Sequence, residues 1–257
     1  MSDRIHGFAA ALRAAQTALI GTWVKIPALS TIEILADAGF DFVVIDMEHA
    51  PLTLEQAYAA TVVAQGAGMQ VLVRVPDRSG SHLQRLLDSG VDGILVPRVT
   101  TAAEAAAAAA AMTFSPAGER GLGSTSRAGR WGGLDSVSYQ ALGADVMRAV
   151  QLEDTGSLEI VSDILDVPHL NGIFLGMGDL QLSSGKKSDS PELQALVTSL
   201  LAEAGTRGIP VGTAVQTADQ VEASIARGFS YVMADNDTGL LRRAATSLVA
   251  DIRGRLT

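Results

Sequence analysis

The stretch FVVIDMEHAPLTLEQAYAATVVAQGAGMQVLVRV, residues 42–75, decides the fold. It opens with an apolar run, Phe42–Met47, and closes with a second one, Val71–Val75. Between the two runs, Thr53 and Gln56 have the spacing of a capping box, in which two side chains satisfy backbone N–H groups at the start of a helix. Two apolar runs joined by a helix are typical of a βαβ unit with parallel strands.

The same pattern recurs along the whole chain. Short β-branched apolar runs alternate with Ala- and Leu-rich amphipathic stretches, which predicts parallel strands separated by helices. Several runs are apolar on both faces, as is typical of buried parallel strands. The expected strands are Leu19–Val24, Phe42–Met47, Val71–Val75, Gly93–Pro97, Ala149–Leu152, Gly172–Leu175, Pro210–Ala214 and Tyr231–Ala234.

The chain length fits a closed form of this arrangement. A chain of 257 residues lies in the usual range of the (β/α)8 barrel. We therefore expect an α/β protein with a single (β/α)8 TIM barrel domain over residues 1–257. Thr101–Met112, TAAEAAAAAAAM, is predicted to be a structural helix, because alanine has the highest helix propensity. Ser190-Pro191 is predicted to begin another helix, with serine as the cap and proline in the first turn.

Charge and composition restrict the partners and the chemistry. The formal net charge of −9 opposes attraction to a phosphate backbone, so we expect no nucleic-acid partner. The absence of cysteine excludes disulfides, thiolate metal sites and a cysteine nucleophile. The first residues lack the order of a signal peptide and no run is long enough to span a bilayer, so we expect a cytoplasmic protein without a membrane partner.

Two segments interrupt the alternation of strands and helices. Thr113–Ser138 is dense in Gly, Ser and Arg and precedes the fifth strand. Its Arg120, Arg127 and Arg130 could meet a second carboxylate of a substrate, or could only hold loop carbonyls. Leu180–Ser190 follows the sixth strand, on the side where barrel loops carry the active site, but its sequence does not reveal a role.

Ionisable residues follow the second and third strands. Asp46, Glu48 and His49 come directly after a buried run, and Arg74 ends the next one. Histidine titrates near neutral pH, so His49 suits proton transfer, with Asp46 orienting it. A fixed cation such as Arg74 can bind a carboxylate or stabilise an enolate oxygen. The alternative is that Arg74 only pairs with one of the two acids at the barrel rim and that His49 is a loop residue.

Two carboxylates follow the fifth and sixth strands. Glu153 lies in AVQLED and Asp179 in IFLGMGDL. Side chains on adjacent strand ends can converge, and paired carboxylates suit a hard divalent cation such as Mg²⁺ or Mn²⁺. Asp154 competes with Glu153, which is nearer the strand. Gly176 and Gly178 let the backbone approach a ligand and expose amides at a helix start. The alternative role of Asp179 is to cap that helix.

Seven motifs together resemble a known family. In chain order they are GTWVKIP, AGFDFVVIDMEHAP, the strand with Arg74, LLDSGVDGILVPRV, SPAGERGLGSTSRAGRW, VQLED and FLGMGDLQLS. They are similar to the HpcH/HpaI-type metal-dependent class II pyruvate aldolases, which include the 4-hydroxy-2-oxoheptanedioate and 2-keto-3-deoxy-sugar-acid aldolases. The resemblance implies reversible cleavage of a hydroxy-α-keto acid to pyruvate, or a related α-keto acid, and an aldehyde. It also implies a divalent metal ion, Mg²⁺, Mn²⁺ or Co²⁺.

The resemblance implies roles for individual residues at the reacting centre. It makes Glu153 and Asp179 the metal ligands. His49 becomes the acid/base with Asp46 behind it, and Arg74 faces the keto oxygen of the substrate.

The resemblance also implies substrate-binding residues and an assembly. The amides of Gly178 and Asp179, beside Gly176, would hold the substrate carboxylate. Trp23 matches an aromatic position near the pocket, where the alternative is a core tryptophan. Asp88 matches an acid that approaches a neighbouring subunit's site, where the alternative is a surface aspartate. A homo-oligomer, in relatives typically a hexamer, is therefore expected.

Three other functions are alternatives to a metal-dependent aldolase. A Schiff-base aldolase would need a lysine at a strand end, and Lys25 follows the first strand. An acyl-CoA lyase of the citrate-lyase-beta type would use a similar metal site, but the loops show no extended basic surface for CoA phosphates. A non-catalytic binding barrel would not need ionisable residues at strand ends.

Met177 stands where family members commonly have proline, so the sequence does not identify the physiological aldehyde and keto acid.

Overall fold

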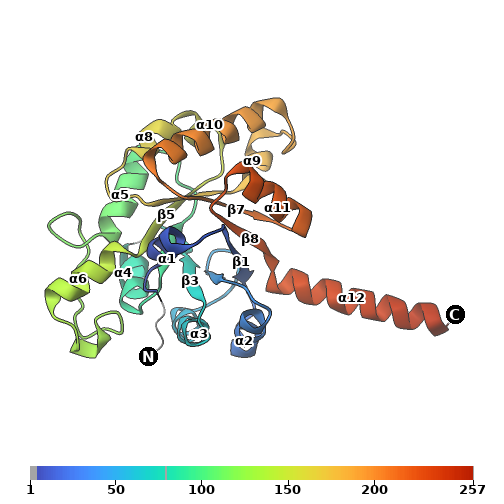
Figure 1. Cartoon of the computed structure of the whole chain (residues 1–257), viewed down its shortest axis with the longest axis horizontal. Coiled ribbons are helices and arrows are strands. Elements are labelled where there is room, and N and C mark those ends of the chain that lie inside the picture. Colours follow the sequence, from blue (N-terminus) through green and yellow to red (C-terminus); the bar gives the residue numbers. More distant parts are fainter. Residues whose placement is uncertain (1–4, 79, 257) are drawn as a thin grey trace.

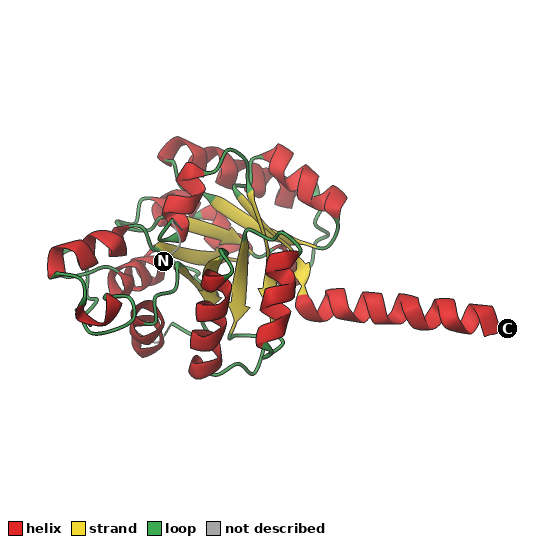
Figure 2. Cartoon of the chain, turned by 60° about the horizontal axis from the view of Figure 1, so that its bottom comes forward, coloured by secondary structure: helices red, strands yellow, loops and turns green. Residues whose placement is uncertain are grey.

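The predicted strands form one closed parallel barrel. In the computed structural model, which describes residues 5–78 and 80–256, neighbouring strands pair in chain order and β8 pairs with β1. This is the (β/α)8 TIM barrel expected from the sequence, with helices around the strands (Figures 1 and 2). Its strands are β1 Leu19–Val24, β2 Phe42–Asp46, β3 Gln70–Arg74, β4 Gly93–Val96, β5 Met147–Leu152, β6 Gly172–Leu175, β7 Val211–Val215 and β8 Tyr231–Asn236.

Two helices begin where their sequence signals predicted. Helix α3, Leu54–Gly66, starts at the capping box: the Thr53 hydroxyl accepts the Gln56 amide and the Gln56 side chain accepts the Thr53 amide. Helix α5, Ala102–Met112, covers the alanine-rich segment and is capped by Thr101.

One predicted cap is wrong in detail. Helix α10, Pro191–Arg207, begins after Ser190, but the Ser190 side chain makes no capping hydrogen bond. Proline at the first helical position has a fixed φ that favours the helix start without such a bond. The remaining helices are α1 Phe8–Ala14, α2 Leu29–Asp37, α4 Gly80–Asp88, α6 Ser136–Ala144, α7 Thr155–Glu159, α8 Val161–Leu165, α9 Met177–Ser184, α11 Ala218–Arg227 and α12 Asp237–Leu256, with a 3-10 turn, η1, over Arg130–Gly132.

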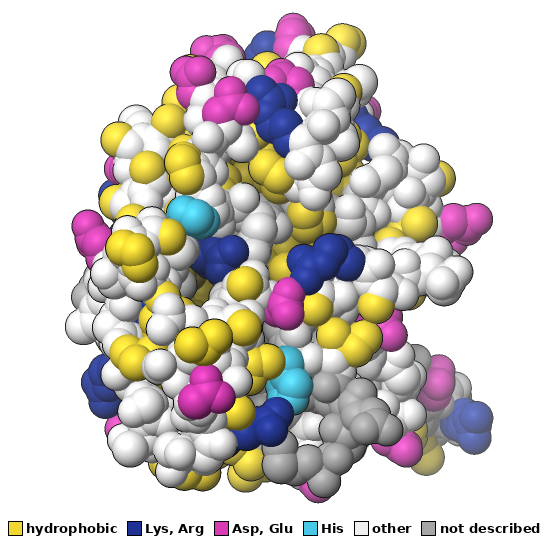
Figure 3. Space-filling view, turned by 60° about the vertical axis from the view of Figure 1, so that its left-hand side comes forward, with side chains coloured by type: hydrophobic (Ala, Val, Ile, Leu, Met, Phe, Trp, Pro, Cys, Tyr) yellow, Lys and Arg dark blue, Asp and Glu magenta, His cyan; other side chains and the backbone are white. Residues whose placement is uncertain are grey.

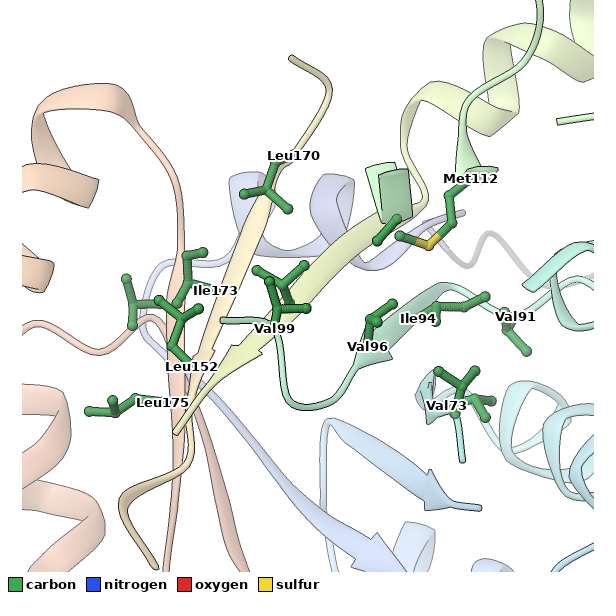
Figure 4. Close-up of a cluster of buried hydrophobic side chains, with 14 of the residues drawn as sticks. Val73, Val91, Ile94, Val96, Val99, Met112, Leu152, Leu170, Ile173 and Leu175 are labelled. Atoms are coloured by element: carbon green, nitrogen blue, oxygen red, sulfur yellow. The ribbon is translucent and has the colours of Figure 1, made fainter. Parts of the chain in front are cut away.

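The outward-facing strand residues pack under the helices. Alternate residues of a barrel strand point out of the barrel, and these form a large aliphatic core with the inner faces of the helices. Figure 4 shows one part of it, in which Ile173 and Leu175 lie on one side of Val99, and Val96, Ile94 and Val73 lie on the other. This core fixes the strand positions and hence the positions of the strand ends.

The inward-facing residues fill the barrel, and aromatic rings close its amino-terminal end. Phe8 of α1 lies with its ring centroid 4.8 Å from that of Phe42 and 5.4 Å from that of Tyr231. Gly212 makes room for Tyr231, since a Cβ at this glycine would lie 2.1 Å from the tyrosine ring. The amino-terminal end of the barrel interior is therefore filled by aromatic side chains.

Strand alternation decides which ionisable residues face that end. Phe42 and Val44 point inward, so Asp46 does as well. The same two-residue step carries Arg74 inward after Leu72. On β5, the inward positions of Met147 and Ala149 are followed by two more, Gln151 and Glu153.

The two segments that interrupt the alternation, Leu180–Ser190 and Thr113–Ser138, differ in secondary structure and in location. Leu180–Ser190 is helical in its first half, because α9 runs to Ser184 and ends at Gly185 in a left-handed conformation (φ 67°). Thr113–Ser138 lies against α4 near the start of β4: the Arg127 guanidinium donates to the Ser89 carbonyl and the Gln65 side chain. Thr113–Ser138 therefore lies on the amino-terminal side of the barrel.

Helix α12 extends away from the barrel (Figures 1 and 2). It leaves open an apolar groove beside β8 and α11, lined by Ile20, Phe40, Val221, Ile225 and Leu240. Along the helix, Leu241 and Leu248 are each 61% exposed. Across the described residues, no helix combines the length and apolar character needed to cross a membrane.

Candidate active site

A buried ion pair joins the ends of β2 and β3. The Arg74 Nε donates to Asp46 Oδ1 at 2.9 Å and its Nη2 donates to Oδ2 at 2.8 Å. Burial raises the pKa of Asp46, but the hydrogen bonds and charge of Arg74, the His49 amide and the charge of Lys25 outweigh it and hold the pKa below its usual value. The carboxylate is therefore ionised and fixes the guanidinium in a forked geometry.

Trp23, at the end of β1, supports the same guanidinium. The Arg74 Cζ lies 4.3 Å from the centroid of the Trp23 ring, a distance that permits a cation–π interaction. The indole itself is 7% exposed and meets Phe174 edge to face at 5.7 Å. Trp23 is thus a core residue, and through Arg74 it is also part of the site.

Three further charged residues extend this ion pair into a row across the strand ends. Lys25 Nζ lies 3.1 Å from Asp46 Oδ2. Glu48 Oε2 lies 3.3 Å from Arg74 Nη1, and its Oε1 lies 3.2 Å from Arg98 Nε. We call these five residues, Lys25, Asp46, Arg74, Glu48 and Arg98, the charged row. Its three inner members are buried, whereas the side chains of Lys25 and Arg98 are 26% and 66% exposed.

The sequence identified Lys25 as a strand-end lysine but missed Arg98, the other outer member of this row. Arg98 lies two residues after the end of β4, close to the kind of position that identified the other candidates. Its backbone has φ 53°, a left-handed conformation that side-chain-bearing residues adopt rarely and that clusters at functional sites.

His49 is not oriented in the way the sequence suggested. Asp46 Oδ1 accepts the backbone amide of His49 at 3.2 Å, while Arg74 occupies both oxygens of that carboxylate. The imidazole is 56% exposed, with Nε2 3.7 Å from Glu48 Oε2. Asp46 therefore holds the main chain at His49 rather than its ring, because its two oxygens already receive Arg74, Lys25 and the backbone amides of Glu48 and His49.

Glu153 is a buried acid at the end of β5. Burial raises its pKa, as do the nearby carboxylates of Asp179 and Glu48, while Gln151 and Arg74 act in the opposite direction. The Gln151 amide donates a short hydrogen bond to Glu153 Oε2. Gln151 thus positions this acid, and strand alternation is the signal that could have identified it.

The neighbouring acid, Asp154, has a different role. Its Oδ1 accepts the Ser157 amide at 2.9 Å, so it caps α7. Of the two adjacent carboxylates, Glu153 faces the site, as the order along the strand suggested.

Asp179 and the glycines lie at the start of α9. The helix begins at Met177 with Gly176 before it, so the amides of Gly178 and Asp179 belong to the first turn, where helical N–H groups have no carbonyl partner within the helix. A Cβ at Gly176 would lie 2.9 Å from Glu153 Cβ, so glycine is required for this close approach. Asp179 is exposed and makes no cap, because the Gly176 position is the N-cap.

These residues fit a divalent cation. Among the described residues no cluster of three or more His or acidic side chains is close enough to hold a metal by itself. Glu153 and Asp179 nevertheless follow neighbouring strands, and burial first and then the charge of Asp179 raise the pKa of Glu153. Two carboxylates with open positions for water and substrate oxygens are typical of Mg²⁺ sites.

Asp88 lies apart from this cluster. At the end of α4, its carboxylate accepts hydrogen bonds from Tyr139 Oη at 3.2 Å and from Gln84 at 2.8 Å, and Arg120 lies at 3.4 Å. It thereby ties the Thr113–Ser138 segment to α4, and the structure does not bring it together with Glu153 in the same chain.

Comparison with known proteins agrees with this geometry. A family model described as HpcH/HpaI aldolase/citrate lyase matches residues 19–244. The solved structure of a protein of that family from Burkholderia cenocepacia J2315 superposes with a TM-score of 0.86 at 28% identity, covering 94% of this chain and 97% of that one. An HpcH/HpaI aldolase from Desulfitobacterium hafniense DCB-2 has the same fold, with a TM-score of 0.90 at 24% identity over 97% of both chains.

Two curated relatives are sugar-acid aldolases. A 2-dehydro-3,6-dideoxy-6-sulfogluconate aldolase of Pseudomonas putida is 31% identical over 242 residues, 93% of this chain and 94% of that one. A 2-keto-3-deoxy-L-rhamnonate aldolase of Shigella sonnei (strain Ss046) is 31% identical over 234 residues, 90% and 87% of the two chains. With the closed barrel and the acids at its strand ends, these matches show that the chain belongs to the HpcH/HpaI aldolase/citrate lyase family.

Proposed function

We propose that the protein is a divalent-metal-dependent aldolase that reversibly cleaves a hydroxy-α-keto acid to pyruvate, or a related α-keto acid, and an aldehyde. The observation that carries the proposal is a cation, Arg74, fixed by Asp46 and Trp23, on a barrel whose neighbouring strands β5 and β6 are followed by two acids, Glu153 and Asp179. A scaffold or binding barrel would not require this combination of paired acids and a fixed cation at strand ends.

The two acids would hold Mg²⁺, Mn²⁺ or Co²⁺. When bound, the ion would act as a Lewis acid that polarises the keto group and acidifies the adjacent methyl protons. The backbone N–H groups of Gly178 and Asp179 at the start of α9 would donate hydrogen bonds to the substrate carboxylate, because this helix end carries partial positive charge.

Arg74 and His49 would act on the reacting atoms. In cleavage, a proton leaves the hydroxyl of the substrate, the adjacent carbon–carbon bond breaks, and its electron pair passes to the keto acid as an enolate. Arg74 would stabilise the negative charge on the enolate oxygen. His49, exposed beside the row of charges, would accept the hydroxyl proton and return it in synthesis.

The relatives indicate the class of substrate. Both are named for keto acids derived from deoxy sugars, so we propose a hydroxy-keto acid of similar size here. The test is a coupled pyruvate-release assay across several such acids, after exhaustive chelation and after return of each metal. Activity in the chelated protein that exceeds background would contradict the proposal.

The same assay addresses a Schiff-base mechanism through Lys25. The Lys25 ammonium is paired with Asp46, and an ammonium is not a nucleophile. Borohydride with pyruvate should therefore leave Lys25 unmodified, and a stable adduct at this lysine would favour the covalent mechanism.

An acyl-CoA lyase activity is the other alternative. The formal net charge of −9 does not favour a phosphate-rich carrier, and on the face shown in Figure 3 basic, acidic and hydrophobic side chains are mixed. A panel of acyl-CoA thioesters in the same assay would reveal this activity if it were present.

We also propose that the protein is a homo-oligomer in which copies exchange α12. In a (β/α)8 barrel the helix after the last strand normally packs on the barrel, but here α12 points away and leaves its apolar groove open. The α12 helix of a second copy has the matching apolar side chains, and it is the occupant we propose.

A further inference from the structure

Lys25 is a charged residue of the site that the proposed chemistry does not use. Its backbone amide and that of Ile26 donate to Asp237 Oδ2 at 2.9 and 2.8 Å, which fixes the main chain directly after β1. Its Nζ lies 3.1 Å from Asp46 Oδ2. Because Asp46 already has a bidentate arginine partner, its charge does not require a second cation.

The charged row therefore carries an excess of positive charge. Lys25, Arg74 and Arg98 contribute three positive charges against the two negative charges of Asp46 and Glu48. A lysine ammonium has three N–H donors, and Asp46 receives one of them. The Lys25 side chain is 26% exposed, so its other donors are accessible from the carboxyl end of the barrel.

The position of Lys25 relates it to one part of the substrate. In the closed strand order, β1 lies across the barrel from β5, which carries Glu153 at its end. The α-keto acid bound at Glu153 and Asp179 would direct its aldehyde-derived carbons away from these acids. That direction leads toward the β1 and β2 side, where His49 and Lys25 lie.

We propose that Lys25 is a specificity-determining residue that binds a terminal anionic group, carboxylate or sulfonate, on the aldehyde-derived part of the substrate. This inference rests on the proposed aldolase function. An anionic end group would accept the hydrogen bonds that the Lys25 ammonium does not donate to Asp46. A neutral alkyl end group would not.

The test compares aldehydes of equal length in the aldol addition to pyruvate. Succinic semialdehyde carries a carboxylate, 3-sulfopropanal a sulfonate, and butanal a methyl group in the same place. We expect the wild-type enzyme to have a higher kcat/KM for at least one anionic aldehyde than for butanal, and the two anionic arms identify the preferred group. In Lys25→Gln and Lys25→Met the anionic-to-neutral ratio should fall about ten- to a hundredfold, the usual effect of losing a hydrogen bond to a charged group.

The ratio separates recognition from general damage to the site. Any effect of the Lys25 substitutions on Asp46 and Arg74 acts on all three aldehydes and cancels, and Gln retains a donor for Asp46. Lys25→Arg should largely keep the ratio. Arg13→Met, which removes a positive charge paired with Asp145 on the opposite side of the barrel, should leave the ratio at the wild-type value.

The outcomes distinguish this inference from the proposed function. Metal-dependent proton exchange at the pyruvate methyl group of the wild-type enzyme needs no aldehyde and reports the proposed function alone. Exchange without any preference for anionic aldehydes, or a preference that survives in both neutral variants, overturns the role of Lys25. Absence of exchange overturns the aldolase proposal and this inference with it.

Discussion

Arg74 is held by three side chains at once. Asp46 binds two of its nitrogens, Glu48 lies beside the third, and the Trp23 ring supports its face. A lysine retains the charge but has neither the fork nor the flat face that these partners contact. The geometry of the cation, as well as its charge, is therefore specified by the fold.

Arg74→Lys should lower aldol cleavage and proton exchange at the pyruvate methyl together. The expected loss is about a hundred- to a thousandfold, as for removal of one preorganised electrostatic contact. Both rates would be measured after metal titration confirms that Glu153 and Asp179 still bind the ion. A variant that loses cleavage but keeps full exchange would place Arg74 away from the enolate oxygen.

His49→Ala should separate the two reactions. Cleavage needs a proton taken from the substrate hydroxyl and should fall about a hundred- to ten-thousandfold, whereas exchange should survive in part, because Arg74 remains in place. His82→Ala is a control, since this histidine lies near Asp77 after β3 and has no role in the proposed reaction. Near-wild-type cleavage in His49→Ala would show that the imidazole is not the acid/base.

Asp46 links the site to the pH dependence of stability. Its pKa is lowered in the folded protein, so its contribution to the free energy of unfolding is present above the ordinary aspartate pKa and is lost as the pH falls through the folded value. Asp46→Asn should cost about 3 kcal/mol at pH 7, by analogy with broken buried ion pairs. Urea unfolding at pH 7, 5 and 3 should show the difference from wild type narrowing with acidity, and a constant difference would contradict the pair's charge as its cause.

At the scale of elements, the ends of β5 and α9 show what the sequence could and could not predict. The short apolar runs predicted the strands to within two residues of their observed ends. They could do so because a strand buried between the barrel interior and the helices needs apolar side chains on both faces. The runs also placed Glu153 and Asp179 at adjacent strand ends. The ion pair of Arg74 with Asp46 was expected only as the alternative to an Asp46–His49 contact, since both partners lie within reach of the carboxylate and the register of β2 against β3, which pairs Asp46 with Arg74, decides between them.

Gln151 and Arg98 were missed for different reasons. Gln151 lies inside a strand and reads as an ordinary polar residue until the inward direction of β5 is known. Arg98 lies in a turn whose left-handed backbone aims its side chain at Glu48, and no pattern of apolar residues reports such a conformation.

The acids at these strand ends should make stability depend on metal. Addition of Mg²⁺, Mn²⁺ or Co²⁺ at about a hundred times its dissociation constant should stabilise the fold by roughly 2.7 kcal/mol, seen as a rise in Tm. Glu153→Gln and Asp179→Asn should abolish the rise. Asp154→Asn weakens only the cap of α7 and should retain it. An equal rise in all of these variants would place the ion elsewhere.

At the scale of the whole molecule, the shape itself predicts assembly. Helix α12 has Leu241, Leu248 and Ile252 on one face at helical spacing, exposed by 61%, 61% and 48%, and large exposed apolar stripes mark interaction sites. The groove that would bury them in the same chain is open and lies beside β8 and α11. Reciprocal exchange of α12 between two copies would bury the apolar face of each helix in the groove of the other copy. It gives a closed two-fold contact to which further subunits can add.

Leu248→Asp should dissociate the exchanged α12 contact, because a carboxylate at the centre of the apolar stripe would be buried against the apolar residues of the partner's groove. Ala250→Asp is the matched control: it adds the same charge two residues along, on the opposite side of the helix, and should leave the assembly intact. Light scattering coupled to gel filtration measures the mass of each. We expect an oligomer for the wild type and the control and a smaller species for Leu248→Asp. A monomeric wild type, or an unchanged mass in Leu248→Asp, would contradict exchange of α12. Because the neighbouring subunit's site is where Asp88 is expected to act, Asp88→Asn should lower cleavage in the oligomer while leaving its mass unchanged.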